Sequence, residues 1–276
     1  MVDINDLSFG YRKNRPLFNN LNLHLPTGNI YGLLGKNGAG KTTLLKHIVG
    51  LLYPQKGDCC VMEQSTKLRS PEVLSEIYFI PEEFQLPAIN IKLFVKLHAP
   101  FYPRFSQTDF EKYLYEFAVD ETAIVGNLSY GQKKKFLISF GLATNTKLLI
   151  LDEPTNGLDI PSKSQFRKII ASSMDEQRSI IISTHQVRDL SSLIDHIIIL
   201  DSGKVVFQQS TYDITSKLAF GQSKNTDASN VIYHEEVLGG YAVISRVDGE
   251  ETQIDMELLF NGVTANPMVI NNVFKN

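Results

Sequence analysis

The sequence is poor in cysteine and has no long apolar run. Its two cysteines, Cys59 and Cys60, are adjacent, which suits neither a disulfide framework nor the C-x-x-C spacing of a zinc site. The longest apolar runs, such as 148–151 and 197–200, span four or five residues, whereas a helix that crosses a bilayer needs about twenty. These absences favour a reducing compartment, the cytoplasm, and argue against a membrane-spanning helix within this sequence.

The chain also has no surplus of basic charge. Its 27 basic and 30 acidic residues give a net charge of −3, so nothing in the overall charge indicates DNA or RNA as a partner. Acidic Asp3 and Asp6 lie where an export signal would be basic. A length of 276 residues with 43% apolar residues suits a folded protein of one large or two smaller domains.

What the chain does contain is a phosphate-binding motif of the form G-x-x-x-x-G-K-[ST]. It follows an apolar run at 30–34 and precedes a helical pattern, which is the setting that the motif requires. In such a loop the backbone N–H groups and the positive end of the helix dipole bind a polyphosphate. Lys41 is expected to reach the β- and γ-phosphates, and Thr42 to bind Mg²⁺. The expected ATP contacts are Gly35, Lys36, Asn37, Gly38, Ala39, Gly40, Lys41, Thr42 and Thr43.

Two carboxylates end a second apolar run, at 148–151. Asp152 is expected to join Thr42 in binding Mg²⁺, and Glu153 to orient or deprotonate a water that attacks the γ-phosphorus. A histidine, His185, follows the apolar run at 179–183, which predicts a position at the tip of a neighbouring strand and a contact with the γ-phosphate.

The pattern of runs predicts an α/β fold, a P-loop NTPase core whose mostly parallel sheet has an antiparallel β flank near the N-terminus. We expect this core over 1–208, with a mostly helical insertion at about 89–143 whose many aromatics pack in its core rather than stack on bases. Residues 209–230, rich in Gly, Ser, Asn and Thr towards their end, predict a linker. A small α+β appendage is expected over 231–276, with a hairpin of 241–247 and 251–254 around Asp248-Gly249.

A further segment, about twenty residues before Asp152, carries a family resemblance. It reads Leu128-Ser129-Tyr130-Gly131-Gln132 and resembles the L-S-G-G-Q signature of ATP-binding-cassette (ABC) ATPases. The other motifs follow in that family's order over roughly 1–208. By this resemblance Tyr11 corresponds to the aromatic that stacks on adenine, Asp159 belongs to a loop that contacts a second subunit, and His185 is the switch histidine.

The resemblance implies an ATPase subunit of a transporter of the single-cassette exporter type. Two copies, or two related subunits, would dimerise head to tail, with each ATP bound between one phosphate loop and the other subunit's Ser129, Gly131 and Gln132. The chain would then act on the cytoplasmic face of a membrane with a separate membrane-spanning permease. The alternative is a soluble ABC ATPase that serves no transporter, for example one of the iron–sulfur assembly type.

The signature can also be interpreted from its residues alone. Ser129 is a good N-cap for a helix whose apolar stripe follows, and the exposed amides beside Gly131 would form an anion site. The run 133–135, three lysines, is expected to lie on the solvent-exposed face of this helix.

Two residues depart from the family pattern. Glu82 stands where a glutamine is usual, and the resemblance places it at the Mg²⁺ and coupling position although it adds negative charge there. Tyr130 replaces the first glycine of the signature, which puts a bulky ring beside the expected nucleotide. The appendage could also sense a ligand or mediate dimerisation, but its sequence contains no chemical motif.

Overall fold

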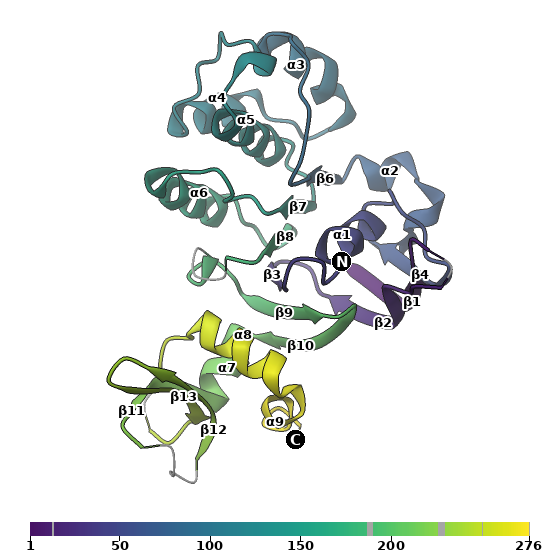
Figure 1. The fold of residues 1–276 in the computed structure, drawn as a ribbon. Helices are drawn as coiled ribbons and strands as arrows, with labels where there is room; N and C mark the ends of the chain where they lie inside the picture. Colours follow the sequence, from purple (N-terminus) through teal and green to yellow (C-terminus); the bar gives the residue numbers. More distant parts are fainter. Residues whose placement is uncertain (13, 187–189, 226–229, 250, 276) are drawn as a thin grey trace.

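A six-stranded sheet lies at the centre of the molecule, in the order β10-β9-β3-β8-β7-β6 (Figure 1). The computed structural model describes residues 1–12, 14–186, 190–225, 230–249 and 251–275. All neighbouring strands of this sheet run parallel except β10, which pairs antiparallel with β9. The strands are β3 (Ile30–Leu34), β6 (Ile77–Ile80), β7 (Leu148–Asp152), β8 (Ser179–Thr184), β9 (His196–Asp201) and β10 (Lys204–Ser210).

The central strands are buried over their whole length, as unbroken Ile/Leu runs predict for a parallel sheet covered on both faces. Every residue of β3, β7 and β8 is buried. The register pairs Leu34 with Thr184 and Asp152 with Ser183, so the carboxyl ends of the three strands meet at one edge of the sheet. Open parallel sheets bind ligands at this edge.

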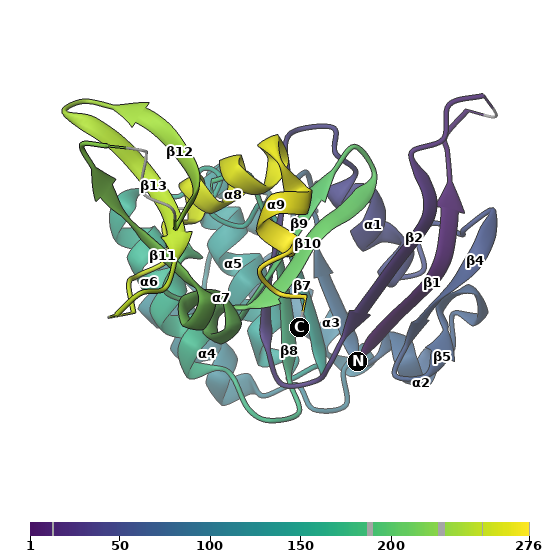
Figure 2. The same cartoon turned by 90° about the horizontal axis from the view of Figure 1, so that it is seen from below.

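A second, antiparallel sheet has the order β2-β1-β4-β5 and flanks the first (Figure 2). Helix α1 (Lys41–Ile48) packs between the two sheets, because its leucines share one buried cluster with residues of β1, β2 and β7. The structure therefore confirms the expected α/β class with an antiparallel flank. The flanking strands are β1 (Val2–Phe9), β2 (Phe18–Leu25), β4 (Lys56–Val61) and β5 (Gln64–Ser65).

The segment from 89 to 143 is helical and forms the upper part of Figure 1. It contains α3 (Ile91–His98), α4 (Gln107–Glu116) and α5 (Tyr130–Ala143). Its aromatics pack against one another in the core: the ring of Phe94 lies edge-on to Phe136, 5.0 Å between centroids, and to Phe140, 5.3 Å. Two further helices, α2 (Pro71–Leu74) and α6 (Ile160–Ser172), precede and follow this segment in the chain.

The C-terminal part differs from the expectation in two ways. Instead of a linker over 209–230, the chain forms α7 (Thr211–Lys217) and strand β11 (Leu218–Ser223), while 226–229 lie outside the described residues. The expected hairpin partner, 251–254, is not a strand. Strand β13 (Gly240–Arg246) pairs instead with β11 on one side and with β12 (Val231–Val237) on the other, so both of its edges are already occupied.

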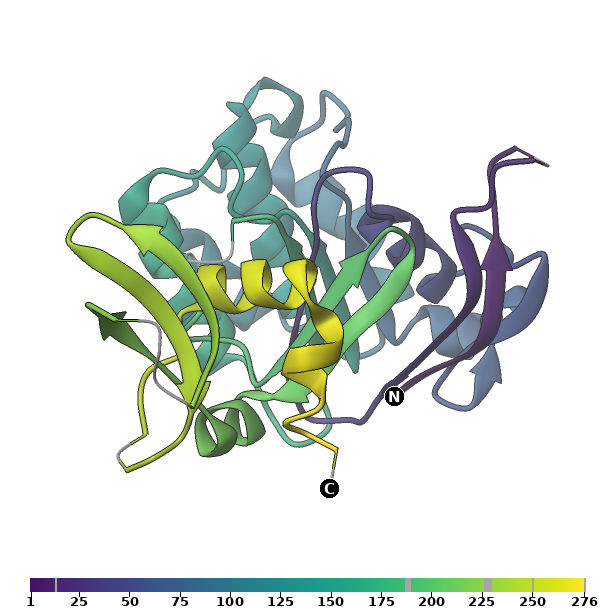
Figure 3. The same ribbon diagram turned by 60° about the horizontal axis from the view of Figure 1, so that its bottom comes forward.

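Two helices connect this small sheet to the central one. Helix α8 (Met256–Ala265) contacts β9, β10 and β13, and α9 (Pro267–Asn271) contacts β10 (Figure 3). The buried apolar side chains of α8 belong to the same cluster as Ile197 and Ile199 of β9. In the described ranges, no helix combines the length and the hydrophobicity that a membrane span needs.

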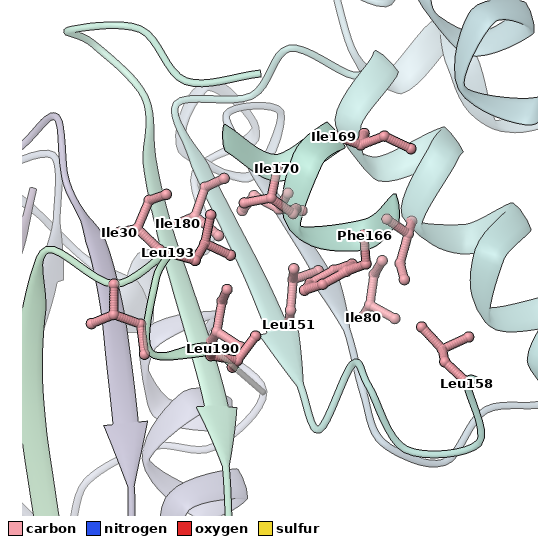
Figure 4. Close-up of a cluster of buried hydrophobic side chains, with 14 of the residues drawn as sticks. Ile30, Ile80, Leu151, Leu158, Phe166, Ile169, Ile170, Ile180, Leu190 and Leu193 are labelled. Carbon is pink, nitrogen blue, oxygen red and sulfur yellow. The ribbon is translucent and has the colours of Figure 1, made fainter. Parts of the chain in front are cut away.

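Phe166 of α6 lies at the centre of the core between the helices and the sheet (Figure 4). It is fully buried, beside Leu151 of β7 and Ile80 of β6. We expect Phe166→Ala to lower the free energy of unfolding by about 3–5 kcal/mol, because the change removes apolar contacts and leaves a cavity. Tyr115→Ala, at a side chain that is 86% exposed, is the control and should change it by less than about 0.5 kcal/mol. Urea unfolding curves measure both, and equal midpoints would contradict the prediction.

Candidate active site

The phosphate loop joins β3 to α1 at the ligand-binding edge of the central sheet. Gly40, the N-cap of α1, has a φ of 109°, and a Cβ there would lie 2.8 Å from the Phe18 ring, so this position requires glycine. A hydrogen bond from the Ala39 N–H to the Lys36 carbonyl closes a turn within the loop. The Lys41 Nζ donates to the Gly35 carbonyl at 2.8 Å, which keeps the ammonium inside the loop.

A cavity of about 650 Å³ opens beside this loop. Most of the loop contributes to its wall, including Lys36, Asn37 and Gly38, together with Glu82 and Glu153. The wall also includes Tyr11, Arg12, Arg15, Pro16 and Leu17. A cavity of this volume accommodates a nucleotide-sized ligand.

Thr42 and Asp152 meet at the floor of the site although 110 residues separate them. The Thr42 hydroxyl donates to the Asp152 carboxylate at 2.6 Å, and the Ser183 hydroxyl donates to the other oxygen of the same carboxylate. Asp152 is fully buried. A hydroxyl and a carboxylate fit Mg²⁺, which takes oxygen ligands and in nucleotide sites binds through one or two protein groups together with phosphate oxygens.

Glu153 is 3% exposed and contacts two other predicted site residues. Its Oε1 lies 3.5 Å from the Lys41 Nζ and 2.8 Å from the His185 Nδ1. The His185 N–H also donates to Oε2, at 3.4 Å. The structure therefore brings the phosphate-loop lysine, the acidic strand end and the histidine together at one point.

Tyr11 lines the cavity and is 64% exposed. Its hydroxyl forms a hydrogen bond of 3.2 Å with the Thr43 hydroxyl, and its ring is edge-on to Phe9 at 5.0 Å. These two contacts orient a flat, accessible aromatic surface beside the phosphate loop.

The signature segment begins α5 with a capping box. The Ser129 hydroxyl accepts the Gln132 N–H at 3.3 Å, and the Gln132 side chain accepts the Ser129 N–H at 3.1 Å. Gly131 is required by close packing, because a Cβ there would lie 2.9 Å from the Gly157 carbonyl. Asp159 caps α6 by accepting the Ser162 N–H at 3.0 Å. Hydrogen bonding from the side chain and then the main chain of Ser162 lowers the pKa of Asp159. None of the described residues that line the cavity comes from these two segments.

The two residues that depart from the family pattern contact each other. The Tyr130 hydroxyl donates to the Glu82 carbonyl at 2.9 Å, and its ring stacks on Phe84 with centroids 5.5 Å apart. Partial burial raises the pKa of Tyr130. The Glu82 side chain accepts a hydrogen bond of 3.2 Å from the Asn156 amide. Tyr130 thus packs on its own chain, which leaves Ser129 accessible.

One expectation about the signature helix is wrong. Lys134, in the middle of the lysine run, is fully buried rather than solvent-exposed. Its ammonium donates to the main-chain carbonyls of Glu153, at 2.6 Å, and Asn156, at 3.2 Å. Burial lowers the pKa of Lys134 to about 8, although nearby carboxylates act in the opposite direction.

Comparison with known proteins agrees with this geometry. Residues 18–156 match the family model described as ABC transporter. The chain is 32% identical over 235 residues to the lantibiotic transport ATP-binding protein SrtF of Streptococcus pyogenes, covering 79% of this chain and 94% of that protein. It is 30% identical over 213 residues to the SkfA peptide export ATP-binding protein SkfE of Bacillus subtilis, covering 75% and 87%.

A solved structure described as the ATP-binding subunit of an ABC transporter superposes with a TM-score of 0.70 at 25% identity, covering 78% of this chain and 91% of that one. The range matched by the family model carries both the phosphate loop and the acidic strand end. The chain therefore belongs to the ABC transporter family and is an ATP-binding subunit with ATPase activity.

Proposed function

We propose that two copies of this chain, or one copy and a related subunit, close head to tail around two ATP, and that hydrolysis drives export through a separate membrane-spanning partner. In this proposal the chain lies on the cytoplasmic face of the membrane. The second copy's Ser129, Gly131 and Gln132 contact the γ-phosphate of an ATP that is bound to the first copy's phosphate loop.

The position of the signature segment carries this proposal. Ser129 and Gln132 are exposed at the N-terminal end of a 14-residue helix, where amides and the helix dipole favour an anion. Yet this end is absent from the described wall of the chain's own cavity. An anion site that lies outside the nucleotide cavity of its own chain can still bind a phosphate when a second subunit supplies it.

Each site residue then has a defined task in hydrolysis. Lys41 binds the β- and γ-phosphates, and Thr42 and Asp152, with Glu82, would bind Mg²⁺, which neutralises phosphate charge when present. Glu153 orients the attacking water and accepts its proton, and His185, hydrogen-bonded to Glu153, contacts the γ-phosphate. Tyr11 stacks on the adenine. Loss of the γ-phosphate removes the group that both subunits bind, so hydrolysis favours the open state.

The transport role is supported by the relatives, which are described as lantibiotic transport and peptide export proteins. In this proposal a cytoplasmic helix of the permease docks at the boundary between the helical segment 89–143 and the sheet core. The alternative, a soluble ABC ATPase, requires no such partner.

We expect Glu153→Gln to accumulate as an ATP-bound dimer, because the variant retains every phosphate contact but lacks the carboxylate that accepts the proton of water. Gel filtration with ATP and Mg²⁺ should show the dimer, and without ATP the monomer. The matched control is Lys41→Ala, which should weaken ATP binding about tenfold or more and form no dimer, since it loses a charge-assisted contact. A Glu153→Gln variant that binds ATP and stays monomeric would contradict the head-to-tail proposal.

The membrane partner can be identified by affinity purification of the tagged chain from detergent-solubilised membranes of its host. We expect an integral-membrane protein to copurify with the wild-type chain. Mass spectrometry of the eluate makes the measurement, with a tagged unrelated ATPase as the control. Copurification with soluble assembly factors alone would favour the soluble ATPase and remove the transport role.

The proposed role of Glu82 predicts a change in metal dependence. Glu82→Gln keeps an oxygen ligand but loses the negative charge, so the Mg²⁺ concentration for half-maximal ATPase activity should rise by about tenfold. Glu83→Gln, the neighbouring carboxylate, is the control and should leave it unchanged. If the rate, the Mg²⁺ dependence and the coupling to the permease are all unaltered in Glu82→Gln, Glu82 has no metal role.

A further inference from the structure

Lys134 is a fully buried cation to which the proposed mechanism gives no task. It lies on α5, in the second turn after the Ser129 cap, and its Nζ ends beneath the loop that follows β7. The ammonium donates to the carbonyl of Glu153 at 2.6 Å and to that of Asn156 at 3.2 Å, and it lies 5.3 Å from the centre of the Tyr130 ring.

A buried charge is stable only where hydrogen bonds and opposite charges compensate its lost hydration. Two main-chain carbonyls supply the hydrogen bonds here, and the carboxylates of Glu82, Glu153 and Asp152 favour the charged form. Because the side chain is enclosed, the ammonium cannot leave these carbonyls without losing its own hydrogen bonds in the interior. The connection between α5 and the loop is therefore stiff.

The carbonyl that Lys134 binds belongs to an unusual peptide. Glu153 has a φ of 48°, in the left-handed region that residues other than glycine rarely adopt. Its N–H donates to the Ser183 carbonyl at 3.1 Å on β8, while its C=O accepts from Lys134. Hydrogen bonds at both its N–H and its C=O thus hold the Glu153 backbone in this conformation. In this conformation the carboxylate contacts Lys41 and His185.

The same ammonium also fixes the start of the loop that leads to Asp159. Its second bond is to the Asn156 carbonyl, and the Asn156 amide donates to Glu82 at 3.2 Å. The next residue, Gly157, lies so close to the Tyr130 ring that a Cβ at this position would be only 2.7 Å from a ring carbon. Lys134 therefore connects the helix of the signature segment directly to the main chain of the loop between β7 and α6, which carries the residues that we assign to hydrolysis and to dimer contact.

We propose that Lys134 is a positioning residue for hydrolysis, which ties the signature helix to the Glu153 peptide and so aligns the Glu153 carboxylate with the γ-phosphate. The inference rests on the proposed function, in which Glu153 accepts the proton of water. When a second subunit's ATP binds at Ser129, the resulting shift of α5 reaches Glu153 through one side chain. Binding of the signature segment to ATP in one site of the dimer is thereby coupled to ATP hydrolysis in the other site.

The first test compares Lys134→Met with Lys133→Met. Methionine has nearly the same shape as lysine but donates no hydrogen bond, so Lys134→Met should lower kcat by about tenfold to a hundredfold. The KM and the Kd for ATP should change by less than about twofold, because the phosphate loop is untouched. Lys133→Met, on the partly exposed side of the same helix, should match the wild type. An unchanged kcat in Lys134→Met would overturn the inference.

Thermal unfolding separates positioning from a purely structural role. A Met variant that keeps the wild-type Tm and Kd for ATP but loses kcat supports positioning, whereas a loss of kcat that merely follows a loss of folded, ATP-binding protein contradicts it. If Lys134→Met does not fold, Lys134→Gln takes its place, because its shorter amide retains a donor. We then expect folded protein with normal ATP binding and a reduced kcat, and a wild-type kcat would contradict the inference.

The second test is a double-mutant cycle with Glu153→Gln, measured by single-turnover hydrolysis of radiolabelled ATP. If Lys134 acts through Glu153, adding Lys134→Met to Glu153→Gln should change the residual rate by less than about twofold. An equal fractional loss in both backgrounds would show that Lys134 does not act through Glu153. A Glu153→Gln variant with full activity would contradict the proposed function itself, which makes the two failures distinguishable.

Discussion

The parallel register of β3, β7 and β8 is the constraint on which the site depends. Residues that are distant in sequence meet because these three strands end at the same edge of one buried sheet. The hydrogen bond between Thr42 and Asp152 crosses 110 positions, and the contact between His185 and Glu153 crosses 32. Strands buried on both faces cannot slip in register without exposing apolar side chains, so the fold determines these distances before any ligand contributes.

Much of this arrangement could be predicted from the sequence because it depends on local patterns. Unbroken Ile/Leu runs indicate buried parallel strands, and a glycine-rich turn before a helix indicates phosphate binding wherever the rest of the chain lies. The same reasoning places Ser129 at a helix N-terminus, where the structure has a capping box. These features are the ones whose physical cause lies within about ten residues.

The parts that could not be predicted depend on tertiary partners. Residues 209–230 predict a linker because their end is rich in Gly, Ser, Asn and Thr, yet 218–223 form an edge of the small sheet because β13 offers an unpaired side. Lys134 belongs to a run of three lysines and so appears polar and exposed. Its burial is explained only by carbonyls 19 and 22 positions further along the chain. Periodicity counts a lysine as polar and contains no information about such acceptors.

Glu82, Tyr130 and Lys134 are best understood together. A carboxylate at position 82 adds negative charge beside Asp152 and Glu153, which by itself opposes the binding of phosphates. Lys134 places a buried positive charge near all three carboxylates, and Glu82 is the strongest of them in favouring its charged form. The Tyr130 hydroxyl binds the Glu82 main chain, and its ring lies beside the same ammonium. The charge that Glu82 introduces is therefore compensated within the chain itself, by a cation whose position is fixed through the signature helix.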